Sequence, residues 1–159
     1  MYKRQSGIGY ATAKLLASNG WIVGIAGRRE DLLLQIQHSH CGIVATQRID
    51  ITEDDATEGL MRLIHKVGGM DMYFHSSGIG YQNASLEASK ELATVSTNVL
   101  GFTRMTDFAF EYFHNHPDTD GIIAVISSIA GTKGLGVAPA YSASKKLSLI
   151  HISEPTRRS

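Results

Sequence analysis

Apolar and polar positions along this chain follow two different periods in turn, which predicts alternating strands and helices. Short apolar runs predict buried strands over residues 21–27, 42–50, 70–78 and 121–128. Stretches with one apolar face predict helices over about residues 10–20, 29–40, 53–69 and 89–113, and a last helix is expected to start near Tyr141. Glycines end several of these stretches, as helix stop signals do.

The predicted strands are apolar on both faces and are separated by helices. Such strands belong to a parallel sheet that helices cover on both sides. The expected fold class is therefore α/β, a doubly wound, Rossmann-like parallel sheet, and ligands bind at the carboxyl ends of its strands. One domain is expected over residues 1–159, since no repeat or low-complexity linker interrupts the pattern.

Composition narrows the classes of partner. Lys and Arg number 15, as do Asp and Glu, so the formal charge is zero and gives no electrostatic reason to expect nucleic acid or an anionic membrane. Cys41 is the single cysteine, which excludes an internal disulfide. No apolar run approaches the length of a membrane span, and no metal site is expected. A cytoplasmic protein is the expectation.

Ser6, Gly7, Ile8 and Gly9 open the first predicted helix. Glycines at that place let the backbone approach a pyrophosphate, and the helix N-terminus supplies free N–H groups. A glycine pair before a helix is often only a turn, so this motif needs support from elsewhere in the chain.

Tyr141 and Lys145 provide support, because their spacing puts them on the same face of a helix. An ammonium one turn away favours the phenolate, which suits Tyr141 as a general acid or base. Ser128 follows an apolar strand, at the ligand-binding edge of such a sheet. Asn98 lies within a predicted helix, where asparagine is a poor choice on propensity alone; a solvent-facing or locally capped Asn98 is the alternative.

Together these residues resemble the short-chain dehydrogenase/reductase family, from about Ser6 to about Lys145. Residues 6–9 match the end of the family's T-G-x-x-x-G-I-G cofactor loop. Asn98, Ser128, Tyr141 and Lys145 match its catalytic tetrad in order and spacing. Further matches are Asp50 and Ile51 at the adenine-contacting position, and H-S-S-G at 75–78, which includes Ser77 and Gly78, in place of the family's N-N-A-G.

The sequence departs from the family pattern at two places, one in the turn after the third predicted strand and one at the end of the second family strand. His75 and Ser76 replace two asparagines, and we expect His75 to form structural hydrogen bonds rather than to act in catalysis. The second family strand ends at Gly27, where relatives that prefer NAD carry an acidic residue. Arg28 and Arg29 follow at once and favour NADP(H) over NAD(H), although a solvated helix start is the alternative for this pair.

The resemblance implies an NADP(H)-dependent oxidoreductase that transfers hydride between nicotinamide and a carbonyl or secondary alcohol. Tyr141 and Lys145 would also contact the cofactor, and the full-length parent would be a homo-oligomer. Two alternatives stay open: a non-catalytic dinucleotide-binding module and an inactive truncated fragment. The first family strand and the C-terminal strands and helices are expected to be missing, and residues 1–5 and about 147–159 are expected to be non-native tails.

Overall fold

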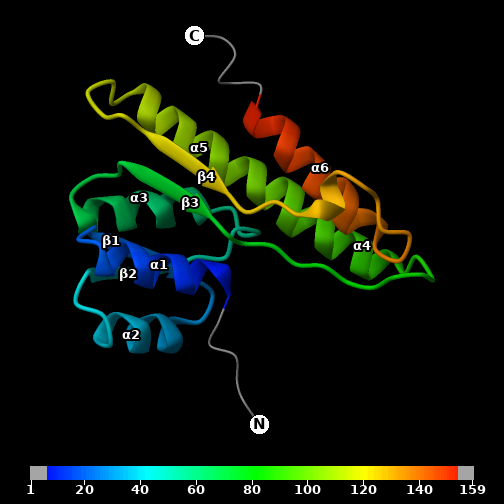
Figure 1. The fold of residues 1–159 in the computed structure, drawn as a ribbon, viewed down its shortest axis with the longest axis horizontal. Helices are drawn as coiled ribbons and strands as arrows, with labels where there is room; N and C mark the ends of the chain where they lie inside the picture. The colour runs from blue at the N-terminus through cyan, green and yellow to red at the C-terminus, as the bar shows by residue number, and fades with distance from the viewer. Residues whose placement is uncertain (1–6, 154–159) are drawn as a thin grey trace.

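Strands and helices alternate along the chain in the computed structural model, which describes residues 7–153 (Figure 1). The elements are α1 (Ile8–Ser18), β1 (Val23–Gly27), α2 (Glu30–His38), β2 (Ile43–Arg48), α3 (Ala56–Val67), β3 (Met72–His75), α4 (Ala88–Val95), a π-helical turn (Ser96–Gly101), α5 (Phe102–His114), β4 (Ile122–Val125), a 3-10 turn (Ile129–Gly131) and α6 (Pro139–Ser153). The expected order of elements is confirmed, and each strand is shorter than its apolar run.

The four strands form two separate parallel pairs. β1 pairs with β2, with Gly27 opposite Arg48, and β3 pairs with β4, with His75 opposite Val125. Among the described residues no strand joins β1 to β3. The parallel α/β arrangement is thus confirmed, but as two pairs rather than one continuous sheet.

Helices cover the strand pairs and build the core. α2 and α3 pack on β1 and β2, and α5 packs on β3, β4 and α3. The main buried cluster lies between α3, α5 and the strands, because the apolar face of α3 is nearly continuous. Its buried members are Ile49, Ile51, Ala56, Leu60, Ile64 and Met105.

The long helix expected over residues 89–113 contains a π-helical turn between α4 and α5. Asn98 and Gly101 are both buried within this turn. A side chain at residue 101 would place its Cβ 2.8 Å from the carbonyl oxygen of Ile51, so the close approach requires glycine. π-helical turns of this kind are frequent at functional sites.

Helix α6 continues through residues 147–153, part of the segment expected to be a tail. Ser148 is buried there and donates to the carbonyl of Lys145 at 3.0 Å. Nε2 of His151 lies 2.7 Å from Oδ1 of Asp107 on α5, so the end of α6 packs against the long helix. The expectations for residues 1–5 and 154–159 fall outside the described residues.

Between residues 7 and 153, no helix combines the length and the apolar character needed to cross a membrane.

Candidate active site

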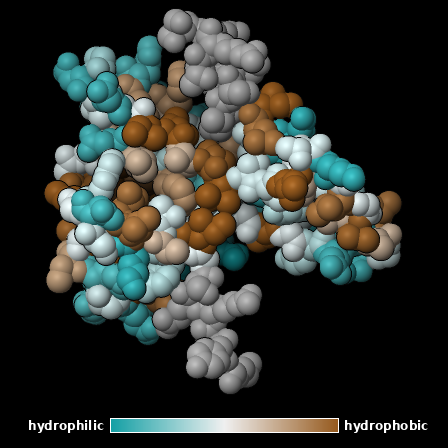
Figure 2. Space-filling model, viewed as in Figure 1, coloured by the Kyte–Doolittle hydropathy of each residue, from teal (hydrophilic) through white to brown (hydrophobic). Residues whose placement is uncertain are grey.

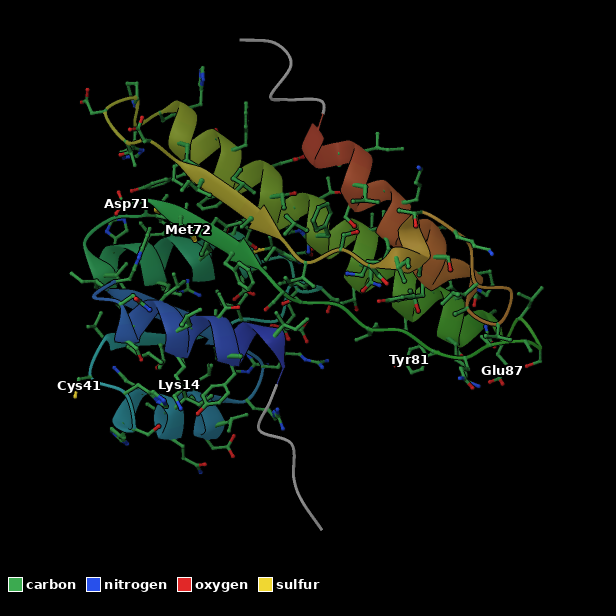
Figure 3. All side chains as sticks on the ribbon, viewed as in Figure 1. Lys14, Cys41, Asp71, Met72, Tyr81 and Glu87 are labelled. Atoms are coloured by element: carbon green, nitrogen blue, oxygen red, sulfur yellow. The ribbon has the colours of Figure 1, made fainter. Side chains whose placement is uncertain are left out.

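A cavity of about 640 Å³ opens beyond the carboxyl ends of β3 and β4. Its wall includes Ser128, Tyr141 and Lys145, three of the four residues expected to be catalytic. Ile8 and Gly78, both expected to contact a cofactor, also line it. Figure 3 shows Tyr81, another lining residue, on the extended segment between β3 and α4. The structure thus brings residues from four parts of the chain to one place.

Lys145 is the charged group of this cavity, and its side chain is held by the fold. The residue is only 9% exposed, and Nζ donates a hydrogen bond to the carbonyl of Ile126 at 2.9 Å. Burial lowers the pKa of this ammonium below its ordinary value. Nζ also lies 5.9 Å from the centre of the Tyr141 ring, so the lysine and the phenol share the site as their spacing predicted.

Tyr141 lies in the first turn of α6 and packs against the backbone of Gly80. A Cβ at residue 80 would stand 2.7 Å from Cδ2 of the tyrosine ring, so any larger residue there would displace the ring. Ser142 next to it accepts a hydrogen bond from the N–H of Leu135 at 2.9 Å. The loop before α6 and the segment after β3 therefore fix the tyrosine from two sides.

Asn98 lies behind the cavity and joins its two walls. It is 5% exposed, and its Oδ1 accepts from the N–H of Ile79 at 2.8 Å. Its Nδ2 donates to the carbonyl of Ile79 at 2.7 Å and to the hydroxyl of Ser144 at 3.0 Å. The amide therefore ties the segment after β3 to helix α6, and neither alternative for Asn98, solvent-facing or locally capped, describes it.

Ser128 follows β4 and begins the 3-10 turn, where its Oγ accepts from the N–H of Ala130 at 3.2 Å. Ser127 donates from its hydroxyl to the carbonyl of Lys145 at 3.2 Å. Gly131 packs so closely under α6 that a Cβ there would stand 2.8 Å from the carbonyl carbon of Lys145. These contacts attach the serine-bearing loop to the helix that carries the tyrosine and the lysine.

The N-terminus of α1 faces the other side of the cavity. Gly7 is its N-cap residue, without a side-chain cap, and no acidic residue lies in the first turn. The first N–H groups of α1 are therefore open to an anion. Gly9 packs on Ser76 so closely that a Cβ would collide with the serine hydroxyl. Ser6, the first residue of the motif, lies outside the described residues.

Arg28 and Arg29 are exposed at the carboxyl end of β1, and Asp50 follows β2 beside them. Burial acts to raise the pKa of Asp50, but two hydrogen bonds from Thr52 and the charges of Arg28 and Arg48 together lower it. Asp50 is thus a carboxylate in the field of Arg28.

The remaining residues expected to contact the cofactor differ in exposure: Ile51 is buried, whereas Ser77 and Gly78 in the segment after β3 are exposed. The side chain of Ile51 is buried in the main cluster, and its carbonyl accepts from Arg104 at 3.1 Å. Ser77 and Gly78 are exposed, and a Cβ on Gly78 would lie 3.5 Å from both Nζ of Lys145 and Oδ1 of Asn98.

His75 is buried at the end of β3, with 3% exposed surface, and its ring has a structural environment. Nδ1 lies 2.8 Å from the hydroxyl of Tyr73, and the ring meets Phe102 edge to face at 5.2 Å. Burial, together with the charge of Lys145, lowers the pKa of His75 to about 4. The imidazole is therefore neutral near pH 7, and its partners are those of a structural residue.

The family follows from comparison with known proteins. The profile of the family described as short chain dehydrogenase matches residues 4–154. The chain belongs to the short-chain dehydrogenase family. Ipsdienol dehydrogenase of Ips pini is 32% identical over 88% of this chain and 59% of its own length. A putative ketoacyl reductase of the monensin polyketide synthase in Streptomyces virginiae is 28% identical over the same share of this chain and 56% of its own length.

Solved structures show the same fold. A short chain dehydrogenase from Mycobacterium smegmatis superposes with a TM-score of 0.84 at 23% identity, over 95% of this chain and 66% of that one. Actinorhodin polyketide ketoreductase with NADPH superposes at 0.80 with 25% identity, over 95% of this chain and 60% of that one. The chain thus spans about three-fifths of the length of such curated relatives.

Sequence reasoning missed a polar cluster that contacts the first turn of α6, next to the candidate active site. Glu91 accepts from Nδ2 of Asn83 at 2.6 Å and from the N–H of Ala140, in the first turn of α6, at 3.1 Å. Asn83 is buried, and its N–H donates to the carbonyl of Val137 at 2.6 Å. No local signal marks Glu91, because in sequence it is one more charge on a helix.

Proposed function

We propose that this short-chain dehydrogenase chain carries the catalytic and cofactor-binding part of an NADP(H)-dependent oxidoreductase. The reaction would interconvert a small carbonyl compound and a secondary alcohol. The observation that carries the proposal is the single cavity that Ser128, Tyr141 and Lys145 share, with the buried Lys145 as its charged group. A pure binding module has no need for a tyrosine and a buried ammonium together.

The residues divide the work by position. Tyr141 would donate its phenolic proton to the carbonyl oxygen during reduction and accept it during oxidation. Lys145, held by Ile126, would stabilise the phenolate. Ser128 would orient the substrate oxygen through a hydrogen bond. Asn98 would hold the wall of the site in place through Ile79 and Ser144.

The cofactor would lie on the side of the cavity opposite α6, where Ile8 of α1 lines the wall. Bound nicotinamide would supply or accept the hydride. The N–H groups of Gly7, Ile8 and Gly9 at the start of α1 would bind the pyrophosphate. Gly9 has no side chain, and a Cβ there would collide with Ser76, so the backbone of this turn can lie close to the segment after β3. Ser6 is a further candidate for binding the pyrophosphate. Candidates for contacts with the remainder of the dinucleotide are Ile51, Ser77, Gly78, Tyr141 and Lys145.

Preference for NADP(H) rests on Arg28 and Arg29, exposed after a strand that ends in Gly27 without a carboxylate. A guanidinium binds a 2′-phosphate bidentately. The alcohol dehydrogenase from the archaeon Thermococcus sibiricus was solved with 5-hydroxy-NADP, and it superposes at a TM-score of 0.81 with 21% identity over 94% of this chain and 67% of that one. Asp50 would contact the adenine part, as the family resemblance implies.

We also propose that the enzyme is cytoplasmic and that it binds neither nucleic acid nor a membrane. The full-length protein would be a homo-oligomer. Exposed apolar side chains along α4, the π-helical turn and α5 favour that assembly. They are Leu92, Val95, Leu100 and Phe110.

The test is a Tyr141→Phe variant compared with wild type in NADPH-dependent reduction of a panel of ketones. Turnover should fall by about a thousandfold or more, because the proton donor is lost, while NADPH binding by fluorescence titration stays within about twofold. Tyr112→Phe, on α5 outside this cavity, is the matched control. Full turnover in Tyr141→Phe would refute the mechanism, and NADPH binding without turnover in wild type would favour a binding module.

A further inference from the structure

Asn83 and Glu91 form a hydrogen-bonded pair where the segment after β3 meets α4 and α6. Asn83 is only 2% exposed, and each polar atom of its side chain has a partner. Nδ2 donates to Oε1 of Glu91 at 2.6 Å and to the carbonyl of Glu87 at 3.1 Å, and Oδ1 accepts from the N–H of Glu87 at 2.9 Å. A buried polar network that is fully satisfied fixes one arrangement of the chain. We call Asn83 and Glu91 the capping pair.

The capping pair supplies a hydrogen-bond acceptor that helix α6 lacks at its start. α6 begins at Pro139, which has no N–H, and the residue before it is Ala138, whose side chain cannot accept a hydrogen bond. The first N–H of the helix is therefore that of Ala140, and Oε2 of Glu91 accepts from it at 3.1 Å. Because Tyr141 is the next residue, Glu91 fixes the turn that carries the candidate proton donor.

The same pair fixes the backbone on which the ring of Tyr141 packs. The ring lies against Gly80, so closely that a Cβ there would stand 2.7 Å from Cδ2 of the ring. Three positions later, the N–H of Asn83 donates to the carbonyl of Val137 at 2.6 Å, which attaches this segment to the loop before α6. The turn that carries the tyrosine and the backbone beside its ring therefore depend on contacts of the same two residues.

Apolar burial contributes little to holding this part of the chain. Figure 2 shows hydrophobic residues on its surface, where Figure 1 places the segment after β3 and the loop before α6 beside α4. Leu86 is 64% exposed and Val137 is 50% exposed. Leu86 also has a φ of 55°, which is disfavoured for leucine. Asn83 holds this turn from both sides, since its carbonyl accepts from the N–H of Leu86 at 3.2 Å and its Oδ1 accepts from that of Glu87.

We propose that Asn83 and Glu91 are positioning residues, which hold the phenol of Tyr141 at a fixed place in the cavity beside Lys145. The inference rests on the proposed function, because Tyr141 is a proton donor only there. A displacement of about 1 Å at a reacting group can cost about a hundredfold in rate. Loss of the pair should therefore lower kcat, while cofactor binding on the α1 side of the cavity is spared.

Glu91→Ala removes both acceptor oxygens and is tested in the 159-residue chain with NADPH and two probe ketones, acetophenone and cyclohexanone. The value of kcat per NADPH-binding site should fall by about tenfold or more, while the dissociation constant of NADPH stays within about twofold. Glu91→Gln keeps one acceptor oxygen and should recover part of kcat. Glu87→Ala is the matched control, because its exposed carboxylate contacts Lys90 at 2.6 Å, and it should keep kcat within about twofold.

A second control separates positioning from a general loss of stability. Ile64→Val removes one methyl group from the main buried cluster, so it should lower the urea midpoint of unfolding. Its kcat per NADPH-binding site should stay within about twofold of wild type. Unchanged kcat in Glu91→Ala, or an equal loss of kcat in Ile64→Val, would overturn the proposal.

Fluorine NMR makes the test independent of turnover. The chain labelled with fluorotyrosine has six labelled tyrosines, and Tyr141→Phe identifies the resonance of Tyr141. This resonance should be sharp in wild type and should broaden or split in Glu91→Ala, whereas that of Tyr112 on α5 should not change. An unchanged Tyr141 resonance in Glu91→Ala would overturn the proposal. If the resonance changes but wild type reduces neither ketone, the proposed reaction fails and the positioning of Tyr141 by Glu91 stands.

Discussion

Replacing Asn98 with alanine removes the amide that joins the two walls of the candidate active site. Its hydrogen bonds to the N–H and carbonyl of Ile79 and to Ser144 span 2.7–3.0 Å. Each such bond contributes about 1 kcal/mol net, and a buried polar group left without a partner costs about 1–3 kcal/mol. Ile79 is only half-buried, so water would partly replace the lost partner. The expected loss of unfolding free energy is about 2–4 kcal/mol.

Urea unfolding of wild type and Asn98→Ala, followed by circular dichroism, measures this loss. With a slope of about 2 kcal/mol per molar urea, the midpoint should fall by about 1–2 M. Asn115→Ala is the matched control, because Asn115 is exposed at the end of α5 and its loss should cost less than about 0.5 kcal/mol. If the two variants unfold at the same midpoint, Asn98 does not tie the two walls of the site together.

Three further predictions rest on other contacts of the site. Gly131→Ala should cost about 1–3 kcal/mol of stability, because its Cβ would press on the backbone of α6, whereas Gly134→Ala, with nothing within 4 Å, should be neutral; thermal unfolding compares the two. Glu91→Ala should lower stability by about 1–2 kcal/mol by removing an acceptor from the first turn of α6, and Glu91→Gln should recover part of it in the same assay. His75 has a folded pKa of about 4, below its unfolded value, so its contribution is complete above about pH 6.5 and is lost as pH falls toward 4. Unfolding at pH 7 and pH 5 should show about 2 kcal/mol less stability at pH 5, and the difference should shrink in His75→Phe.

The order and type of the elements could be predicted from the sequence because each buried strand is a short apolar run and each helix keeps one apolar face. The strand boundaries could not. Trp21 and Ile22 continue the apolar run of β1, yet both are exposed and precede the paired residues. Pairing depends on which edge a neighbouring strand offers, and the hydrophobic pattern of one segment carries no such information.

The candidate catalytic residues follow from the resemblance to the short-chain dehydrogenase/reductase family, and the structure places three of them around one cavity. The supporting contacts could not be predicted, because their partners are distant in sequence. Asn98 is hydrogen-bonded to Ile79 and Ser144, which lie 19 and 46 positions away, and Glu91 accepts from Ala140, which lies 49 positions away. For His75 the sequence favoured a structural role, and its buried hydrogen bond to Tyr73 agrees with that prediction.

The central claim, that this chain binds NADP(H) through Arg28, is tested most directly by titrating the 159-residue chain with NADPH and then NADH and following the cofactor's fluorescence. Saturable binding that favours NADPH is predicted, and Arg28→Gln should lose about tenfold in NADPH affinity, about 1.4 kcal/mol, with little change for NADH. Tighter binding of NADH, or binding of neither cofactor, would contradict the account.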